Sequence, residues 1–295
     1  MKQTIREAVK AGRVLVSDGA WGTFLQQSGL KPGDCPEEWN LTQPDVVRKI
    51  AQSYIAAGSD MVETNSFGAS SFKLAHYGLS DKAGEINEAA ARLSREAAGD
   101  NRWVIASVGP TGKMLVMGDV TEEELYEAFK EQAIALERGG ADAVCIETMI
   151  DAAEASIAIR ATKENTSLEI IATFTFDAIG GGEYRTMMGI SPTEAATAAI
   201  QAGADIIGSN CGNGLEGMIQ VVNEIRAACP ETPILVHANA GLPHYENGKD
   251  EFPDSPEQMA AFVVPILKAG ANIIGGCCGT TPQHIAAIKQ TIEKV

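Results

Sequence analysis

The sequence has little positive charge, no long apolar run and few cysteines. Lys and Arg supply 23 of its 295 residues against 39 Asp and Glu, which gives a net charge of -16. A chain this acidic is poorly suited to a phosphate backbone or an anionic membrane surface as its main partner. No apolar stretch approaches the roughly 18 residues that suggest a membrane span. We therefore expect neither a nucleic-acid partner nor a membrane partner.

Six cysteines are too few for a disulfide framework in a chain of this length. The first ten residues read as a polar amphipathic helix and lack the apolar core and small-residue cleavage site of a signal peptide. We expect a cytoplasmic protein whose thiols stay reduced. Roles for cysteine as a metal ligand or a nucleophile therefore come before disulfide bonding.

Linkers rich in Pro or Ser and shifts in composition are also absent, so we expect a single domain over residues 1–295. What recurs is a short apolar run, a polar or glycine-rich cluster, and then an Ala- and Glu-rich helical stretch. Near-continuous apolar runs are typical of parallel strands buried on both faces. Eight runs fit this description: 14–17, 60–63, 103–107, 143–146, 170–175, 206–209, 234–237 and 272–275.

Eight strand and helix units predict a (β/α)8 TIM-type barrel, an α/β fold whose reactive groups gather at the carboxyl ends of the strands. Capping-box patterns at 121–124 and 191–194 mark the starts of two of the helices. The alternative is an open doubly wound sheet with one ligand site at its switch point. Polar clusters after most of the eight runs favour the closed barrel.

Three cysteines stand where two of these runs end. Cys211 follows the sixth run, and Cys277 and Cys278 follow the eighth between glycines. In a closed barrel these loops share a rim, and three thiolates with an open fourth position suit a catalytic zinc ion. Such a site is better at holding an incoming thiol as a thiolate than at making hydroxide, so its natural reaction is alkyl transfer to sulfur. Core or redox cysteines are the competing interpretation.

Several other residues have structural explanations. The remaining cysteines, in a loop, an apolar strand and a helix end, are assigned no role: Cys35, Cys145 and Cys229. His237 ends an apolar strand and is either a proton relay or a satisfied core histidine. Trp21 and Phe67 lie near the expected mouth of the barrel, where they either face a methyl donor or pack at the rim.

Five motifs in this order resemble the homocysteine S-methyltransferase family. They are SDGAWGT at 17–23, VETNSFG at 62–68, GSNC at 208–211, the segment 233–241 ending in NAG, and GGCCGTTP at 275–282. The resemblance covers residues 13–290. It is stronger to the homocysteine-binding barrel of cobalamin-dependent methionine synthase than to betaine or S-methylmethionine enzymes. The segments CGNG at 211–214 and HA at 237–238 depart from the methionine synthase pattern.

The resemblance implies roles for particular residues. Three positions match the zinc ligands that also carry the catalysis: Cys211, Cys277 and Cys278. Four positions match residues that hold the amino acid head group of homocysteine: Asp18, Gly19, Thr64 and Glu147. Asn239 matches a residue of the substrate site that can occupy the fourth position on the metal when no thiol is bound.

The resemblance also implies a reaction, the zinc-dependent transfer of a methyl group to the thiolate of homocysteine to give methionine. The donor that we expect is methylcobalamin on a separate corrinoid protein or module, which acts as a partner in trans. One alternative keeps the zinc and thiolate chemistry but uses another thiol or donor, such as S-methylmethionine or betaine, or serves a demethylation pathway. Another is a non-catalytic module that binds homocysteine or zinc.

Overall fold

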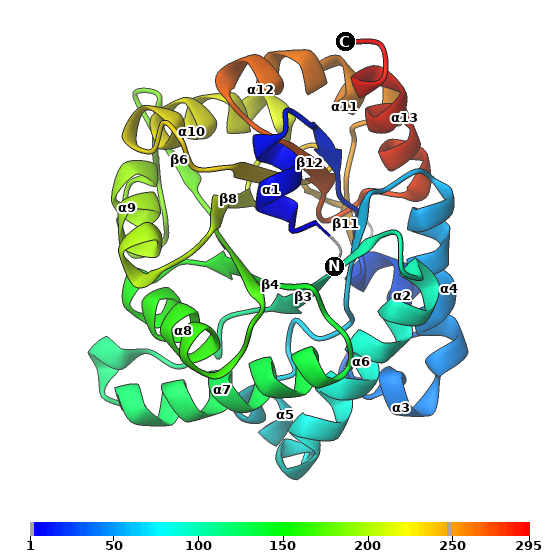
Figure 1. Cartoon of the computed structure of the whole chain (residues 1–295), viewed down its shortest axis with the longest axis vertical. Coiled ribbons are helices and arrows are strands. Elements are labelled where there is room, and N and C mark those ends of the chain that lie inside the picture. Colours follow the sequence, from blue (N-terminus) through cyan, green and yellow to red (C-terminus); the bar gives the residue numbers. More distant parts are fainter. Residues whose placement is uncertain (1–2, 247–248) are drawn as a thin grey trace.

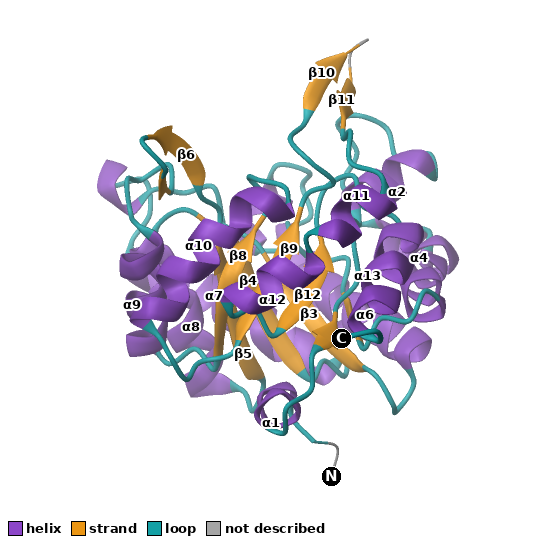
Figure 2. Cartoon of the chain, turned by 90° about the horizontal axis from the view of Figure 1, so that it is seen from above, coloured by secondary structure: helices purple, strands orange, loops and turns teal. Residues whose placement is uncertain are grey.

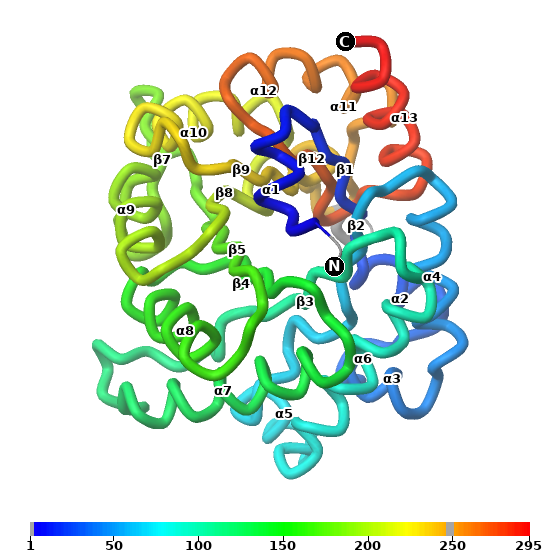
Figure 3. The backbone as a smooth tube through the Cα atoms, in the orientation of Figure 1, coloured from blue at the N-terminus to red at the C-terminus, as the bar shows by residue number. Residues whose placement is uncertain are grey.

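The computed structural model describes residues 3–246 and 249–295. Eight parallel strands form one sheet in the order β1-β12-β9-β8-β5-β4-β3-β2. They are β1 (Leu15–Val16), β2 (Met61–Glu63), β3 (Trp103–Val108), β4 (Ala143–Met149), β5 (Glu169–Phe174), β8 (Ile206–Asn210), β9 (Ile234–Ala238) and β12 (Ile273–Gly276). Figure 3 follows the chain once around this sheet, so that the first and last strands are neighbours, with Leu15 opposite Ile273.

The two end strands of the sheet, β1 and β2, also meet. The backbone N–H of Asp60 donates a hydrogen bond of 2.7 Å to the carbonyl of Val16, and the Asp60 carboxylate accepts one of 2.9 Å from the Val16 N–H. These contacts bring the sheet to a nearly closed barrel. The predicted (β/α)8 fold is confirmed.

Helices surround the strands in an outer ring (Figure 1). The longer ones are α4 (Pro44–Ala56), α6 (Ala83–Ala98), α7 (Glu122–Arg138), α8 (Ala152–Asn165), α9 (Pro192–Ala202), α10 (Leu215–Ala228), α12 (Val263–Ala269) and α13 (Pro282–Ile292). The shorter ones are α2 (Gly22–Gln27), α3 (Trp39–Thr42), α5 (Ser71–Ala75), α11 (Pro256–Ala261) and the 3-10 turns η1 (Ser80–Lys82) and η2 (Leu115–Met117). Both predicted capping boxes form, at the starts of α7 and α9.

The first helix, α1 (Ile5–Lys10), covers the amino-terminal end of the barrel. Ile5 and Ala8 are fully buried there in one cluster with Leu15 and Met61. The carboxylate of Glu169 accepts hydrogen bonds of 2.7 Å from the first two backbone N–H groups of the helix. The buried face of α1 therefore extends the barrel core at this end.

Two hairpins rise from the opposite end of the barrel (Figure 2). One is β6 (Asp177–Gly180) with β7 (Glu183–Arg185), and the other is β10 (His244–Glu246) with β11 (Lys249–Glu251). Three consecutive glycines at 180–182, all with positive φ, make the turn of the first hairpin. In the part of the chain that the structure describes, no helix has the length and apolar character needed to cross a bilayer.

Candidate metal and substrate site

Three cysteine thiols meet at the carboxyl end of the barrel. Cys211 directly follows β8, and Cys277 and Cys278 directly follow β12. The Sγ atom of Cys211 lies 2.8 Å from Sγ of Cys277 and 3.9 Å from Sγ of Cys278, and the latter two are 3.9 Å apart. The structure thus brings together the three residues that the sequence predicts as a cluster.

Strand β9 lies between β8 and β12 and fixes both cysteine loops. The backbone N–H of Cys211 donates to the carbonyl of His237 at 3.0 Å, and that of Cys277 donates to the carbonyl of Ala238 at 2.7 Å. A Cβ atom on Gly276, just before the paired cysteines, would lie 2.3 Å from Oγ1 of Thr280. Glycine therefore lets the chain turn tightly beside the thiols.

Asn239 supports the thiols through the backbone. Its Oδ1 atom accepts a hydrogen bond of 3.1 Å from the N–H of Cys278, and its own N–H donates to the carbonyl of Asn213 at 3.3 Å. Asn239 is buried beside the three thiols. This position is compatible with the predicted role near the metal, and it gives Asn239 a second role in holding the Cys278 loop.

The thiol cluster fits a zinc ion in its chemistry. Tetrahedral zinc with bonds of about 2.3 Å to sulfur places its ligands about 3.8 Å apart, close to the two separations of 3.9 Å. The third separation is shorter, so Cys211 and Cys277 would move apart by about 1 Å to reach that geometry. Hydrogen bonds from Cys211 and Cys277 lower the pKa of Cys278 to about 3. The pKa values of Cys211 and Cys277 are raised in the same cluster, so Cys278 is the thiol that most readily takes the thiolate form, the form that binds metal.

The other cysteines lie apart from this cluster. All three are buried as free thiols: Cys35, Cys145 and Cys229. Burial raises the pKa of each one, which keeps it protonated and unreactive. Their surroundings agree with the interpretation that they have no chemical role.

A cavity of about 260 Å³ opens beside the thiols. Its described lining includes three of the predicted head-group residues: Gly19, Thr64 and Glu147. The three clustered cysteines line it as well, together with Trp21 and Phe67. The cavity therefore joins the predicted metal site to most of the predicted substrate site.

Asp18 does not line the cavity but holds two residues that do. Its carboxylate accepts hydrogen bonds from the indole Nε1–H of Trp21 at 2.9 Å and from the backbone N–H of Glu63 at 2.8 Å. Burial raises the pKa of Asp18. Asp18 was predicted as a head-group residue, and the structure places it behind the cavity wall, where it holds Trp21 and Glu63.

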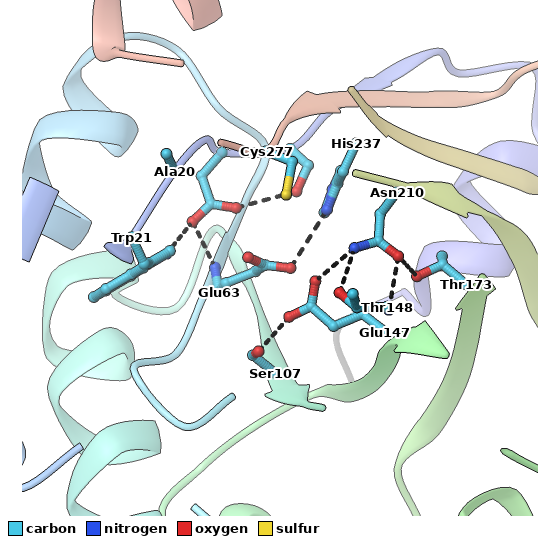
Figure 4. A network of polar contacts seen from close by, with 12 residues as sticks. Ala20, Trp21, Glu63, Ser107, Glu147, Thr148, Thr173, Asn210, His237 and Cys277 are labelled. Carbon is cyan, nitrogen blue, oxygen red and sulfur yellow. Dashed lines mark hydrogen bonds and ion pairs between the residues drawn. The ribbon is translucent and has the colours of Figure 1, made fainter. Parts of the chain in front are cut away.

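Glu63, Glu147 and His237 form a buried polar cluster at the cavity (Figure 4). Their ligand atoms lie within 4.8 Å of one another, and Oε1 of Glu63 is 3.4 Å from Nδ1 of His237. Oε1 of Glu63 and Nε2 of His237 find no hydrogen-bond partner among the described residues. His237 is therefore not a fully satisfied core histidine.

The sequence analysis did not predict Glu63 as a site residue. A charged residue at the end of a buried strand, directly before the predicted head-group residue Thr64, could have indicated it. Burial and the neighbouring Asp18 raise the pKa of Glu63 well above the ordinary range. Burial, and then the charge of Glu63, raise the pKa of Glu147 to about 8. Burial lowers the pKa of His237. A cation that enters the cavity would favour the ionised carboxylates, so the cluster suits an ammonium group.

The fold and the site together define a TIM barrel with three thiols at its rim that could hold a metal ion. The family model for homocysteine S-methyltransferase matches residues 15–292. Methionine synthases of Mycobacterium leprae and Mycobacterium tuberculosis are 33% and 32% identical over 96% and 97% of this chain. The chain spans about a quarter of the length of these relatives.

The solved structure of the homocysteine methyltransferase MmuM from Escherichia coli has a similar fold. Its metallated form superimposes with a TM-score of 0.80 at 22% identity, covering 97% of this chain and 99% of that one. Its oxidized form gives a TM-score of 0.79 at 24% identity, covering 98% and 99%. The chain belongs to the homocysteine S-methyltransferase family. The predicted family and its enzyme class are confirmed.

Proposed function

We propose that this chain catalyses zinc-dependent transfer of a methyl group to the thiolate of homocysteine, which gives methionine. The methyl donor is methylcobalamin on a separate corrinoid protein or module, and the reaction takes place in the cytoplasm. The observation that carries the proposal is the cluster of three sulfur atoms, each within 3.9 Å of the others, at a cavity that also presents buried carboxylates.

Cys211, Cys277 and Cys278 would hold the ion. Zinc, when bound, supplies the Lewis acidity that keeps an incoming thiol deprotonated at neutral pH. The glycines and the β9 carbonyls hold the sulfurs in place before any ligand arrives. Asn239 anchors the Cys278 loop, and on this proposal its side chain would occupy the fourth position on the ion in the absence of a thiol.

The carboxylates that line the cavity hold the amino acid head group. Glu147, supported by Glu63, pairs with the ammonium group, because buried carboxylates gain most from an opposite charge. Gly19 and Thr64 face the cavity where the carboxylate of homocysteine would be held. Anchoring both ends of the substrate fixes the direction in which its sulfur attacks the donor methyl group, and this positioning lowers the barrier.

Zinc-edge X-ray absorption on the purified protein, with and without homocysteine, tests this proposal. We expect three sulfur ligands and one nitrogen or oxygen ligand without homocysteine, and four sulfur ligands with it. A matched sample with 4-mercaptobutyrate, which lacks the ammonium group, should require a higher concentration for the same change. Absence of zinc from protein purified under reducing conditions, or three sulfur ligands at saturating homocysteine, would contradict the proposal.

The donor is identified by competition. Methylcobalamin, S-methylmethionine and betaine are offered together with homocysteine, each with a distinct isotope in its methyl group. Methionine should carry the methylcobalamin label. If methionine carries the label of S-methylmethionine or betaine, that compound is the donor and the corrinoid partner is contradicted. Zinc-dependent binding of homocysteine without any turnover would indicate a non-catalytic binding module.

A further inference from the structure

Two residues at the cavity have a backbone conformation that only glycine adopts freely. Among the described residues, Thr148 at φ 59° and Cys211 at φ 57° are the only non-glycine residues with positive φ. A β-branched residue such as Thr148 is especially disfavoured there. Strained residues of this kind persist only where the surroundings hold them, and they concentrate at functional sites. The question is which group holds these two.

The side chain of Asn210 contacts the first of them through both of its polar atoms (Figure 4). Its Oδ1 atom accepts hydrogen bonds of 2.7 Å from the backbone N–H of Thr148 and from Oγ1 of Thr173. Its Nδ2 atom donates to Oγ1 of Thr148 at 2.7 Å and lies 3.5 Å from Oε2 of Glu147. The amide is fully buried, and only an amide of this length provides both the acceptor and the donor.

The backbone of Asn210 leads directly into the second strained residue. Its carbonyl accepts a hydrogen bond of 2.9 Å from Oγ1 of Thr175, and the next residue, Cys211, is tied by its N–H to the carbonyl of His237. Asn210 therefore joins two left-handed residues, Thr148 and Cys211. Thr148 lies near the carboxyl end of β4, where the strand register shifts, and Cys211 directly follows β8.

We propose that Asn210 is a positioning residue that sets the thiol of Cys211 relative to the carboxylate of Glu147. The distance between these two groups must match the distance from the sulfur to the ammonium group of the acceptor, so Asn210 controls how well one amino acid thiol fits both subsites. The identity of that acceptor rests on the proposed function. The structural link between the two left-handed residues stands on the hydrogen bonds alone.

Three variants test the role. Asn210→Ala removes both polar atoms, and Asn210→Asp keeps the acceptor but loses the donor. The control is Asn87→Ala, because Asn87 is equally buried and bonds two backbone carbonyls at 2.8 Å outside the cavity. Zinc affinity is measured by chelator competition without homocysteine, and steady-state kinetics give KM and kcat at saturating zinc.

We expect Asn210→Ala to weaken zinc binding and to raise the KM for homocysteine by about tenfold each, the scale of one lost buried hydrogen-bonding group. The kcat at saturation should change less, because the sulfur chemistry is intact once both ends are bound. Asn210→Asp should keep near wild-type zinc affinity and show the raised KM, since its carboxylate disfavours the ionised form of Glu147 that pairs with the ammonium group. Asn87→Ala should change neither quantity.

Adding Thr148→Gly to Asn210→Ala separates positioning from general stability. Glycine adopts the left-handed conformation without strain, so the KM of the double variant for homocysteine should fall part of the way back to the wild-type value. Its zinc affinity should stay low. The inference is overturned if Asn210→Ala has the same zinc affinity and the same KM for homocysteine as Asn87→Ala. It is also overturned if adding Thr148→Gly does not lower the KM of Asn210→Ala. If Asn210→Ala does not fold, wild-type KM in Asn210→Asp overturns it. A wild-type protein that binds zinc but not homocysteine contradicts only the proposed function, because zinc affinity still tests Asn210.

Discussion

Replacing Glu147 by Gln should flatten the pH dependence of stability. Burial and the charge of Glu63 raise the pKa of the Glu147 carboxyl to about 8 in the folded chain, against an ordinary value of 4.5. Between these values the unfolded chain has released the proton and the folded chain still holds it. Folding is therefore favoured at low pH, and this contribution is lost as pH rises from 4.5 to about 8.

The size of the effect follows from the linkage between proton binding and folding. One extra proton in the folded state costs about 1.4 kcal/mol of unfolding free energy for each unit of pH. Over the range from about pH 6 to about pH 7.5, Glu147 should remove about 2 kcal/mol. Glutamine is neutral throughout, and its side-chain oxygen can still accept the hydrogen bond from Oγ of Ser107. The variant should lack this part of the slope.

Urea denaturation of the reduced, metal-free protein at the two pH values measures the difference. Glu123→Gln is the control, because Glu123 is exposed on α7 and its loss should leave the slope unchanged. Wild type and Glu147→Gln with parallel pH dependences would refute the argument that Glu147 is buried with its proton. In calorimetry with homocysteine, wild type should also release about one more proton than the variant near pH 7.

Three further predictions follow from single contacts. Cys277→Ser should lose bound zinc and methyl transfer. Its far-UV circular dichroism spectrum should stay near that of wild type, because a rim residue contributes little to the barrel core. Unchanged zinc content and turnover would contradict this prediction. Trp21→Phe removes the indole donor to buried Asp18, and we expect a loss of about 1–3 kcal/mol of stability and a raised KM for homocysteine, measured by denaturation and initial rates. Gly208→Ala would place Cβ against the backbone carbonyl oxygen of Leu235 in β9, so we expect this variant not to fold stably in a thermal melt. Gly84→Ala is the control: its Cβ would meet no atom within 4 Å, so its melting temperature should be unchanged or higher.

Local sequence patterns were sufficient for the fold. Buried parallel strands need near-continuous apolar runs, and helix starts need capping side chains, so the eight units and the starts of α7 and α9 could be read from neighbouring residues. The cysteine cluster followed from the same reading, because strand ends share one rim in a barrel. The ordered motifs then added the family and the head-group residues.

The sequence alone therefore determined the barrel, the three thiols and the family, since each of these depends on local patterns or ordered motifs. Only the tertiary structure showed that Asp18 bonds Trp21 and Glu63 at the cavity wall, that Glu63 and His237 each keep a buried polar atom without a hydrogen bond, and that Asn210 joins two strained residues. Most of these relations link groups on different strands. They depend on the depth and direction of each side chain in the closed barrel, which no local pattern records.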